Sequence, residues 1–293
     1  MGYHKLLRKV VTLQRKRKLI QEGSKVLVAF SGGVDSVALT LSFLDLWDFF
    51  KMGRLALAHI NHGLREREAQ RDEDFCIDFA SRKGLEIFVK RIKVRELAVG
   101  RNLEEAAREE RYKALREIKE RESLDLIATA HHLKDLVETM LLWLVRGAGR
   151  EGLLGFDEKE GDIVRPLYLV KREEIEDYVK SKGESWVEDS TNYDLRFARN
   201  RIRYRVLPVL KSINSNLEES FLRLREVLKE EENLLKELTE RAIENVVRDG
   251  TIDREAFLNL PYALQRRVIY KLFGLRSLKE VDRMINTLKR RAY

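Results

Sequence analysis

Four short apolar segments recur in the first half of the chain, at residues 26–30, 55–60, 86–92 and 124–130. Charged segments with apolar residues at every third or fourth position separate them, at 34–50, 66–83 and 102–122. Nearly continuous apolar runs are typical of strands that are covered on both faces. In the segments between them, apolar residues repeat with the period of an amphipathic helix. The alternation predicts an α/β fold built on a parallel, doubly wound sheet.

The pattern changes beyond residue 150. A glycine-rich stretch at 146–156 precedes a short helix expected at about 171–182, and an arginine-rich helix is expected to end near Pro208. A leucine-rich helical stripe then begins at residue 217. These changes predict a catalytic domain at residues 1–214 and a small all-helical domain at residues 215–293.

The N-terminal segment is basic and amphipathic, and no linker separates it from the first apolar segment. We therefore expect a folded helix with a solvated basic face.

No apolar run approaches the roughly 20 residues that a membrane-spanning helix needs, so no membrane partner is expected. Cys76 is the single cysteine, which excludes an intrachain disulfide framework and favours a reducing cytoplasm.

The chain carries a formal net charge of +8 and has a pI near 9.4. A basic excess of this size favours a polyanionic partner. Charge alone leaves the choice between a nucleic acid and no such partner open.

The segment SGGVDS, residues 31–36, joins the first expected strand to the first expected helix. Gly32 and Gly33 are expected to adopt backbone dihedrals closed to other residues and to let a ligand approach the backbone. Ser31 and Ser36 supply hydroxyls, and amides at a helix N-terminus favour a phosphate. Asp35 would repel a bare phosphate, which suggests a bridging Mg²⁺ or an orienting role. An ordinary tight turn explains only one serine and one glycine, so the segment predicts a phosphate cradle.

SGGVDS resembles the SGGxDS loop of the ATP pyrophosphatase (PP-loop) superfamily, whose members split ATP between its α and β phosphates to adenylate a substrate. Four further segments resemble the tRNA(Ile)-lysidine synthetases: NHGLR at 61–65, NLEEAAREERY at 102–112, HHLKDLVETMLLWLVRGAG at 131–149 and DSTNYDLRFARNRIRYRVLPVL at 189–210. Together the segments cover about the first 215 residues. The resemblance implies ATP, Mg²⁺, free L-lysine and an isoleucine tRNA with a CAU anticodon as ligands. It also implies that the C-terminal domain contacts tRNA.

The resemblance places ATP contacts in two loops. The first set is Ser31, Gly32, Gly33, Val34, Asp35 and Ser36, with Asp35 as a catalytic residue and the metal ligand. The second set, expected near the nucleoside, is His59, Asn61, His62, Gly63 and Arg65. On the residues alone, NHGLR is equally consistent with a plain turn in which Gly63 permits the chain reversal.

Asp135 and Glu138 lie three residues apart, so on a helix they share one face. Two carboxylates there could hold a cationic amino acid, and a solvated acidic face is the alternative. The resemblance adds Arg111 to these two as a catalytic and lysine-binding residue, although it could equally be a surface arginine. Lys134 departs from related sequences, which often carry an acidic residue at that position.

Arg196, Arg199 and Arg203 are expected to share a helical face, and Arg205 follows in the same segment. Guanidinium groups suit phosphate recognition, so these four arginines are candidate tRNA contacts. A solvated charged face is the alternative.

Two other functions remain open at this point. A tRNA thiolase on the same scaffold would ordinarily need cysteines, and Cys76 is a weak candidate because its helical pattern predicts burial. A nucleotide-regulated RNA-binding protein would need no chemistry. Many lysidine synthetases carry a further C-terminal domain, so the chain is expected to be a short form or incomplete. An exposed apolar stripe in the last domain would favour a homodimer.

Overall fold

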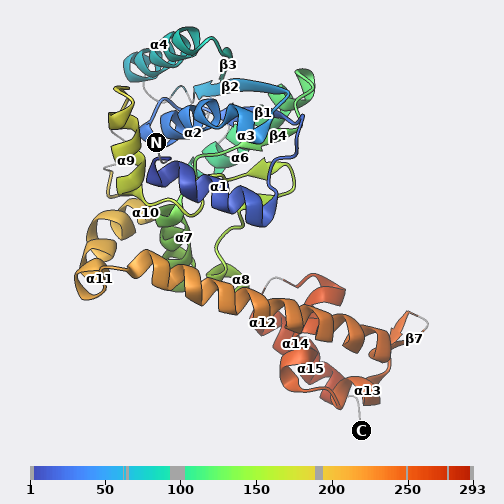
Figure 1. Ribbon diagram of the computed structural model, residues 1–293. Helices are drawn as coiled ribbons and strands as arrows, with labels where there is room; N and C mark the ends of the chain where they lie inside the picture. The colour runs from blue at the N-terminus through green and yellow to red at the C-terminus, as the bar shows by residue number, and fades with distance from the viewer. Residues whose placement is uncertain are drawn as a thin grey trace. The chain divides into compact units, whose positions relative to one another are not determined.

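A computed structural model describes residues 3–61, 63, 66–92, 103–188, 194–248, 250–275 and 277–290 (Figure 1). The chain forms two compact units, Met1–Leu222 and Arg223–Tyr293. The first unit contains the large sheet and the second is mainly helical. None of the helices in the described ranges is long and apolar enough to cross a membrane.

The described part of the first unit contains a six-stranded sheet with the order β3-β2-β1-β4-β6-β5. Its strands are β1 (Lys25–Ala29), β2 (Arg54–Asn61), β3 (Glu86–Arg91), β4 (Leu126–Ala128), β5 (Lys159–Glu160) and β6 (Ile163–Val164). All neighbouring pairs are parallel except β5 with β6 at the edge. The four predicted strands and the mainly parallel sheet are confirmed.

Helices cover both faces of the sheet (Figure 1). Val26 and Val28 of β1 belong to one apolar cluster, which includes residues of α1 (Lys5–Arg17), α2 (Val34–Asp45) and α4 (Glu66–Lys83). Leu27 points the other way, into a cluster with Leu115 and Ile118 of α6 (Leu103–Arg121). All three β1 residues are fully buried, which is why their run shows no polar alternation.

The remaining helices of the first unit lie before β2, after β4 or in the second half of the unit. They are α3 (Trp47–Phe50), α7 (Leu133–Val145), α8 (Arg150–Leu153), α9 (Arg172–Ser181), α10 (Ala198–Arg201) and α11 (Leu207–Ile213). The predicted N-terminal helix and the predicted helix at 171–182 correspond to α1 and α9 and are confirmed.

The arginine-rich helix does not end near Pro208, so that prediction is wrong. A π-helical turn, Ile202–Val206, joins α10 to α11, and the helical path continues to Ile213. Pro208 lies in the first turn of α11, directly after the π-helical turn, and as a proline it has no N–H to donate to the turn that precedes it.

The second unit begins within α12 (Leu217–Val246). It continues through a hairpin of two-residue strands, β7 (Val247–Arg248) and β8 (Thr251–Ile252), and then α13 (Arg254–Leu258), α14 (Tyr262–Phe273) and α15 (Leu278–Arg290). Its core is a separate apolar cluster centred on Phe257, Val268 and Ile285. Apart from the hairpin, the unit is helical as predicted.

The carboxyl ends of β1, β2 and β4 lie at one edge of the sheet, because these strands are parallel. β1 lies between β2 and β4, so the chain connections leave in opposite directions on its two sides. Such a switch point opens a crevice in which α/β proteins bind ligands. SGGVDS follows β1 and HHLKD follows β4, which places both segments at this crevice.

Candidate functional site

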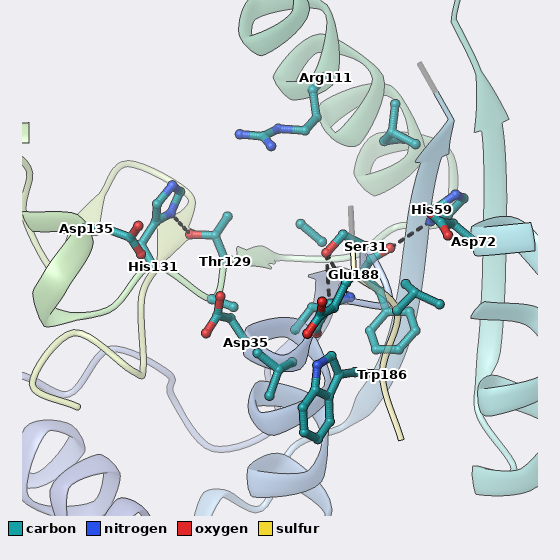
Figure 2. Close-up of a pocket in the computed structure, with 18 of the residues that line it drawn as sticks. Ser31, Asp35, His59, Asp72, Arg111, Thr129, His131, Asp135, Trp186 and Glu188 are labelled. Atoms are coloured by element: carbon teal, nitrogen blue, oxygen red, sulfur yellow. Dashed lines mark hydrogen bonds between the residues drawn. The ribbon is translucent and has the colours of Figure 1, made fainter. Parts of the chain in front are cut away.

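A cavity of about 650 Å³ lies at this edge of the sheet (Figure 2). Its walls come from the segments at the ends of β1, β2 and β4, from α4, α6 and α9, from residues 186–188 and from the π-helical turn. Labelled lining residues include Ser31, Asp35, His59, Arg111, Thr129, His131, Asp135, Trp186 and Glu188. The volume is in the range of sites that bind molecules the size of a nucleotide.

The loop after β1 is held in shape by its own serines. The Ser36 hydroxyl donates to the Gly33 carbonyl at 2.9 Å, and the Gly33 N–H donates to Ser31 Oγ at 3.3 Å. Gly32 has a φ of +80°, and a Cβ there would lie 2.8 Å from Val187 Cγ2. The Val187 N–H in turn donates to the Gly32 carbonyl at 3.0 Å. Gly32 is therefore required both by its backbone angle and by the wall that packs on it.

The expectation for Gly33 is wrong in one respect. Its φ of −72° is open to every residue, and it serves as the N-cap of α2. Gly33 nevertheless lines the cavity, so its missing side chain leaves the start of α2 accessible to a ligand.

Gly32→Ala is expected to destabilise the first unit by about 1–3 kcal/mol and to weaken nucleotide binding, because the backbone strain adds to the clash with Val187. Thermal or denaturant unfolding and an ATP titration measure the two effects. Gly23→Ala is the matched control, since Gly23 has the same φ of +80° with nothing within 4 Å of its added Cβ. Equal losses in the two variants would show that the contact with Val187 is unimportant.

Asp35 lies in the first turn of α2, where the helix dipole favours a carboxylate. Arg172 Nη1 donates to both of its oxygens, at 2.8 Å and 2.7 Å. His132 Nε2 lies 3.6 Å from Asp35 Oδ1 on the other side. Asp35 is thus the meeting point of the cradle with α9 and with the segment after β4.

Among the described residues, no group of three or more His, Cys, Asp or Glu side chains is arranged to hold a metal ion. Mg²⁺ commonly takes one or two protein carboxylates together with substrate phosphates and water. The single cradle carboxylate of Asp35 fits a Mg²⁺ that arrives with a nucleotide rather than one held by protein ligands alone.

The segment after β2 lines the cavity and also builds its own turn. Asn61 Oδ1 accepts from the Gly63 N–H at 2.9 Å, and Gly63 has a φ of +62°. Asn61 Nδ2 donates to Glu73 Oε2 at 2.9 Å. These contacts fit the turn interpretation of NHGLR, while Asn61 and Gly63 still face the cavity. His62 and Arg65, the other predicted ATP contacts here, lie outside the described residues.

His59 lines the cavity but is only 6% exposed. Its Nδ1 lies 3.1 Å from the Phe30 carbonyl and 3.2 Å from Cys76 Sγ. Burial lowers the pKa of His59 and raises the pKa of the Cys76 thiol. A buried, protonated thiol is a poor nucleophile, so the single cysteine is poorly suited to sulfur transfer.

Glu138 is fully buried and is held by two arginines. Arg203 Nε donates to Oε1 at 2.7 Å, and Arg199 Nε donates to Oε2 at 3.1 Å. Glu138 is not among the residues that line the cavity. In this arrangement the carboxylate positions Arg199 and Arg203 and does not face a ligand.

Asp135 lines the cavity and caps α7. Its Oδ2 accepts from the His132 N–H at 3.0 Å, which closes a capping box. Burial alone would raise the pKa of Asp135, but the charges of His132 and Arg199 outweigh burial and hold it below its ordinary value. Asp135 is therefore an ionised carboxylate at the cavity wall. Its predicted neighbour Glu138 lies on the same helix but turns to the arginines.

Arg111 of α6 also lines the cavity and lies above Thr129 in the view of Figure 2. Its guanidinium lies 5.5 Å from the ring centroid of Tyr112, and burial lowers its pKa. An arginine retains its charge even so, because its ordinary pKa is so high.

His131 Nδ1 lies 2.9 Å from Thr129 Oγ1, and burial lowers the pKa of His131 well below its ordinary value, so the imidazole is neutral.

The four predicted tRNA arginines separate into two pairs. Arg199 and Arg203 point inward, to Glu138. Arg196 is 85% exposed and pairs with Asp194, and Arg205 is exposed. Arg196 precedes α10, so the predicted common helical face of Arg196, Arg199 and Arg203 does not form.

A family model described as "PP-loop domain" matches residues 3–210, which include the cradle and every wall of the cavity. The chain belongs to the PP-loop domain family. The resemblance of SGGVDS to this superfamily is thereby confirmed.

The PP-loop chain is also similar to curated proteins named tRNA(Ile)-lysidine synthase. It is 42% identical to one from Persephonella marina over 264 residues, which cover 89% of this chain and 58% of the relative. It is 42% identical to one from Pseudothermotoga lettingae over 234 residues, which cover 79% of this chain and 52% of the relative. The chain thus spans between half and three-fifths of the length of these relatives.

Among solved structures, the PP-loop fold is similar to that of the U34-tRNA thiolase NcsA from Methanococcus maripaludis. The TM-score is 0.65 at 17% sequence identity, and the match covers 77% of this chain and 78% of the thiolase. At this identity the similarity concerns the fold alone.

Several residues of the PP-loop cavity were not predicted, above all Arg172 and the wall at Trp186, Val187 and Glu188. The start of α9 gives no local signal for Arg172, because Glu173 and Glu174 in the same first turn already complement the helix dipole. Lys134, noted as a departure from related sequences, also lines the cavity, and burial lowers its pKa.

Proposed function

We propose that this PP-loop protein is an ATP-dependent ligase. It adenylates the wobble cytidine of the CAU anticodon of an isoleucine tRNA and joins L-lysine to it, forming lysidine. The observation that carries the proposal is that one cavity combines the phosphate cradle with Asp135 and Arg111, two charged groups suited to an amino acid. The names of the relatives support the same activity.

The chemistry is a two-step substitution. The O2 of cytosine attacks the α-phosphate of ATP, and pyrophosphate leaves with the electrons of the broken bond. The ε-amine of lysine then attacks C2, AMP departs with the former O2, and the amine loses a proton. Neither step requires a covalent bond to the protein.

The cradle residues bind the β and γ phosphates through the amides at the start of α2 and through the hydroxyls of Ser31 and Ser36. Asp35 would hold a Mg²⁺ that arrives with ATP, and such an ion would supply charge neutralisation at the leaving pyrophosphate. His59, Asn61 and Gly63 form the wall expected near the nucleoside.

Asp135 is the candidate acceptor for a lysine ammonium group, and Arg111 is the candidate partner of the lysine carboxylate. Glu138 acts on lysine binding through Arg199 and Arg203, which it positions next to Asp135. This division of roles follows from the burial of Glu138 and from the position of Asp135 at the cavity wall.

Arg111→Ala is expected to raise the KM for lysine by about 10- to 150-fold, the value of one charge-assisted hydrogen bond. The KM for ATP is expected to change far less. Initial rates at saturating tRNA and varied lysine measure the effect, and Arg116→Ala, an exposed arginine on the same helix, is the control. Equal changes in the two KM values would contradict a specific role in lysine binding.

The proposed function is tested by incubating the protein with ATP, Mg²⁺, labelled lysine and an isoleucine tRNA transcript with a CAU anticodon. Digestion to nucleosides is expected to release labelled lysidine, together with AMP and pyrophosphate. A sulfur-dependent product without lysine incorporation would instead indicate the thiolase. Binding of tRNA without any pyrophosphate release would indicate an RNA-binding protein without chemistry.

The remaining assignments stay predictions. We expect the exposed Arg196 and Arg205, together with residues 215–293, to contact the tRNA. A homodimer and a location in the cytoplasm are likewise expected, and analytical ultracentrifugation measures the first of these.

A further inference from the structure

The guanidinium of Arg172 occupies the carboxylate that the proposed function assigns to the metal. Arg172 Nη1 donates to Asp35 Oδ1 at 2.8 Å and to Oδ2 at 2.7 Å. With both oxygens engaged, Asp35 cannot offer the same lone pairs fully to a cation. The Arg172 guanidinium and a metal-bound triphosphate therefore compete for this carboxylate.

A second contact holds Arg172 beside the cradle. Its Nε donates to Glu176 Oε1 at 2.8 Å, one turn further along α9. Nη1 is the atom that reaches Asp35, so a small rotation about the side chain releases Asp35 without moving Nε far from Glu176. The Arg172 side chain is 33% exposed and lines the cavity, which gives the guanidinium space to move.

The ion pair between Arg172 and Asp35 is also weak enough for Arg172 to exchange Asp35 for another anion. Both side chains are about one-third exposed, and partly solvated pairs contribute little net stability. A phosphate group is a strong partner for the two parallel N–H donors of a guanidinium, because it has several acceptor oxygens and carries more negative charge than one carboxylate.

The cradle itself lacks a cation. SGGVDS contains no lysine or arginine, unlike nucleotide loops that carry their own lysine. The basic residues among the described cavity lining are Arg111, Lys134, Arg172 and Arg203, and Arg172 is in direct contact with the loop. A leaving pyrophosphate in the cradle would lie next to this side chain.

We propose that Arg172 is an exchangeable phosphate ligand. Without nucleotide, Arg172 pairs with Asp35. When a metal-bound triphosphate fills the cradle, the Arg172 side chain rotates and its guanidinium binds the β and γ phosphates instead. The inference rests on the proposed ATP site and adds a residue that the loop motif does not contain. Asp35 then becomes a better metal ligand when the phosphates that accept Arg172 are present.

Equilibrium binding by calorimetry tests the proposal without turnover. The probes are α,β-methylene-ATP, inorganic pyrophosphate and AMP, each with Mg²⁺. Arg172→Ala is expected to weaken the first two by about 10- to 100-fold and to change AMP binding by less than about twofold. The affinity of Arg172→Lys for these two probes is expected to lie between those of the wild-type protein and Arg172→Ala. Lys180→Ala is the control, because Lys180 is an exposed cation on the same helix.

If Arg172 only blocked Asp35, its removal would leave pyrophosphate binding unchanged or tighter, and that result would overturn the proposal. If the wild-type protein bound neither triphosphate nor pyrophosphate, the proposed ATP site itself would fail.

A double-mutant cycle in EDTA provides an independent arm. Asp35→Asn removes the competing carboxylate, so pyrophosphate binding is expected to tighten when Arg172 is present. In the Arg172→Ala background the gain is expected to be at least about fivefold smaller. Equal gains in both backgrounds would show that Arg172 does not transfer to the phosphates.

Discussion

Asp35→Ala is expected to slow tRNA-dependent pyrophosphate release by about 100- to 1000-fold, the usual cost of removing one preorganised electrostatic group from a reaction site. Asp35 lies in the first turn of α2 inside the cradle, and the proposed function assigns Mg²⁺ to this carboxylate. Its loss also frees Arg172 from its ion pair, so ground-state phosphate binding falls less than the rate does. Rapid-quench measurement of pyrophosphate from saturating ATP, lysine and tRNA gives the rate constant.

Asp48→Ala is the control for this experiment, because Asp48 is an exposed carboxylate in the first turn of α3. It is expected to react at the native rate. A native rate for Asp35→Ala, with the same metal dependence, would remove Asp35 from the mechanism and leave the cradle without its metal ligand.

Glu138→Ala is expected to lower the free energy of unfolding of the first unit by about 3–5 kcal/mol, because it leaves two partly buried arginines without their nearest counterion. Arg199 and Arg203 both direct their Nε donors to this carboxylate, and each is only 22% exposed. Denaturant unfolding followed by tryptophan fluorescence measures the loss. The large effect distinguishes Glu138 from the many exposed ion pairs of the chain, which contribute at most about 1 kcal/mol each.

Glu120→Ala provides the comparison, since Glu120 is an exposed residue near the end of α6, and its loss is expected to be within about 0.5 kcal/mol. A similarly small loss for Glu138→Ala would mean that the two arginines find other partners. In that case Glu138 would be free to turn toward the cavity, as the sequence first suggested.

The parallel sheet was predictable because its physical cause is local. Residues 26–30 are apolar without alternation because both faces of β1 are covered. The loop that follows has a positive φ at residue 32, and the sequence has glycine there, the residue that adopts this angle most readily. The position of SGGVDS at the carboxyl edge then followed from strand direction alone. These features depend on a few neighbouring residues, so the sequence displays them.

The roles within the cavity were less predictable because they depend on contacts between distant segments. Arg172 and Asp35 are 137 positions apart, and no spacing rule connects them. Spacing placed Asp135 and Glu138 on one helical face, but it could not show that Arg199 and Arg203 bury one of the two. Arg196 precedes α10 instead of sharing its face with Arg199 and Arg203, and the helical period alone cannot show where that helix begins.

A crystal structure of the protein with Mg²⁺ and α,β-methylene-ATP tests most directly whether the loop at residues 31–36 binds the triphosphate. We expect the β and γ phosphates to contact the amides at the start of α2, with the metal on Asp35 and the base near His59. A nucleotide bound elsewhere while this loop stays empty, with Arg172 still on Asp35, would contradict the account.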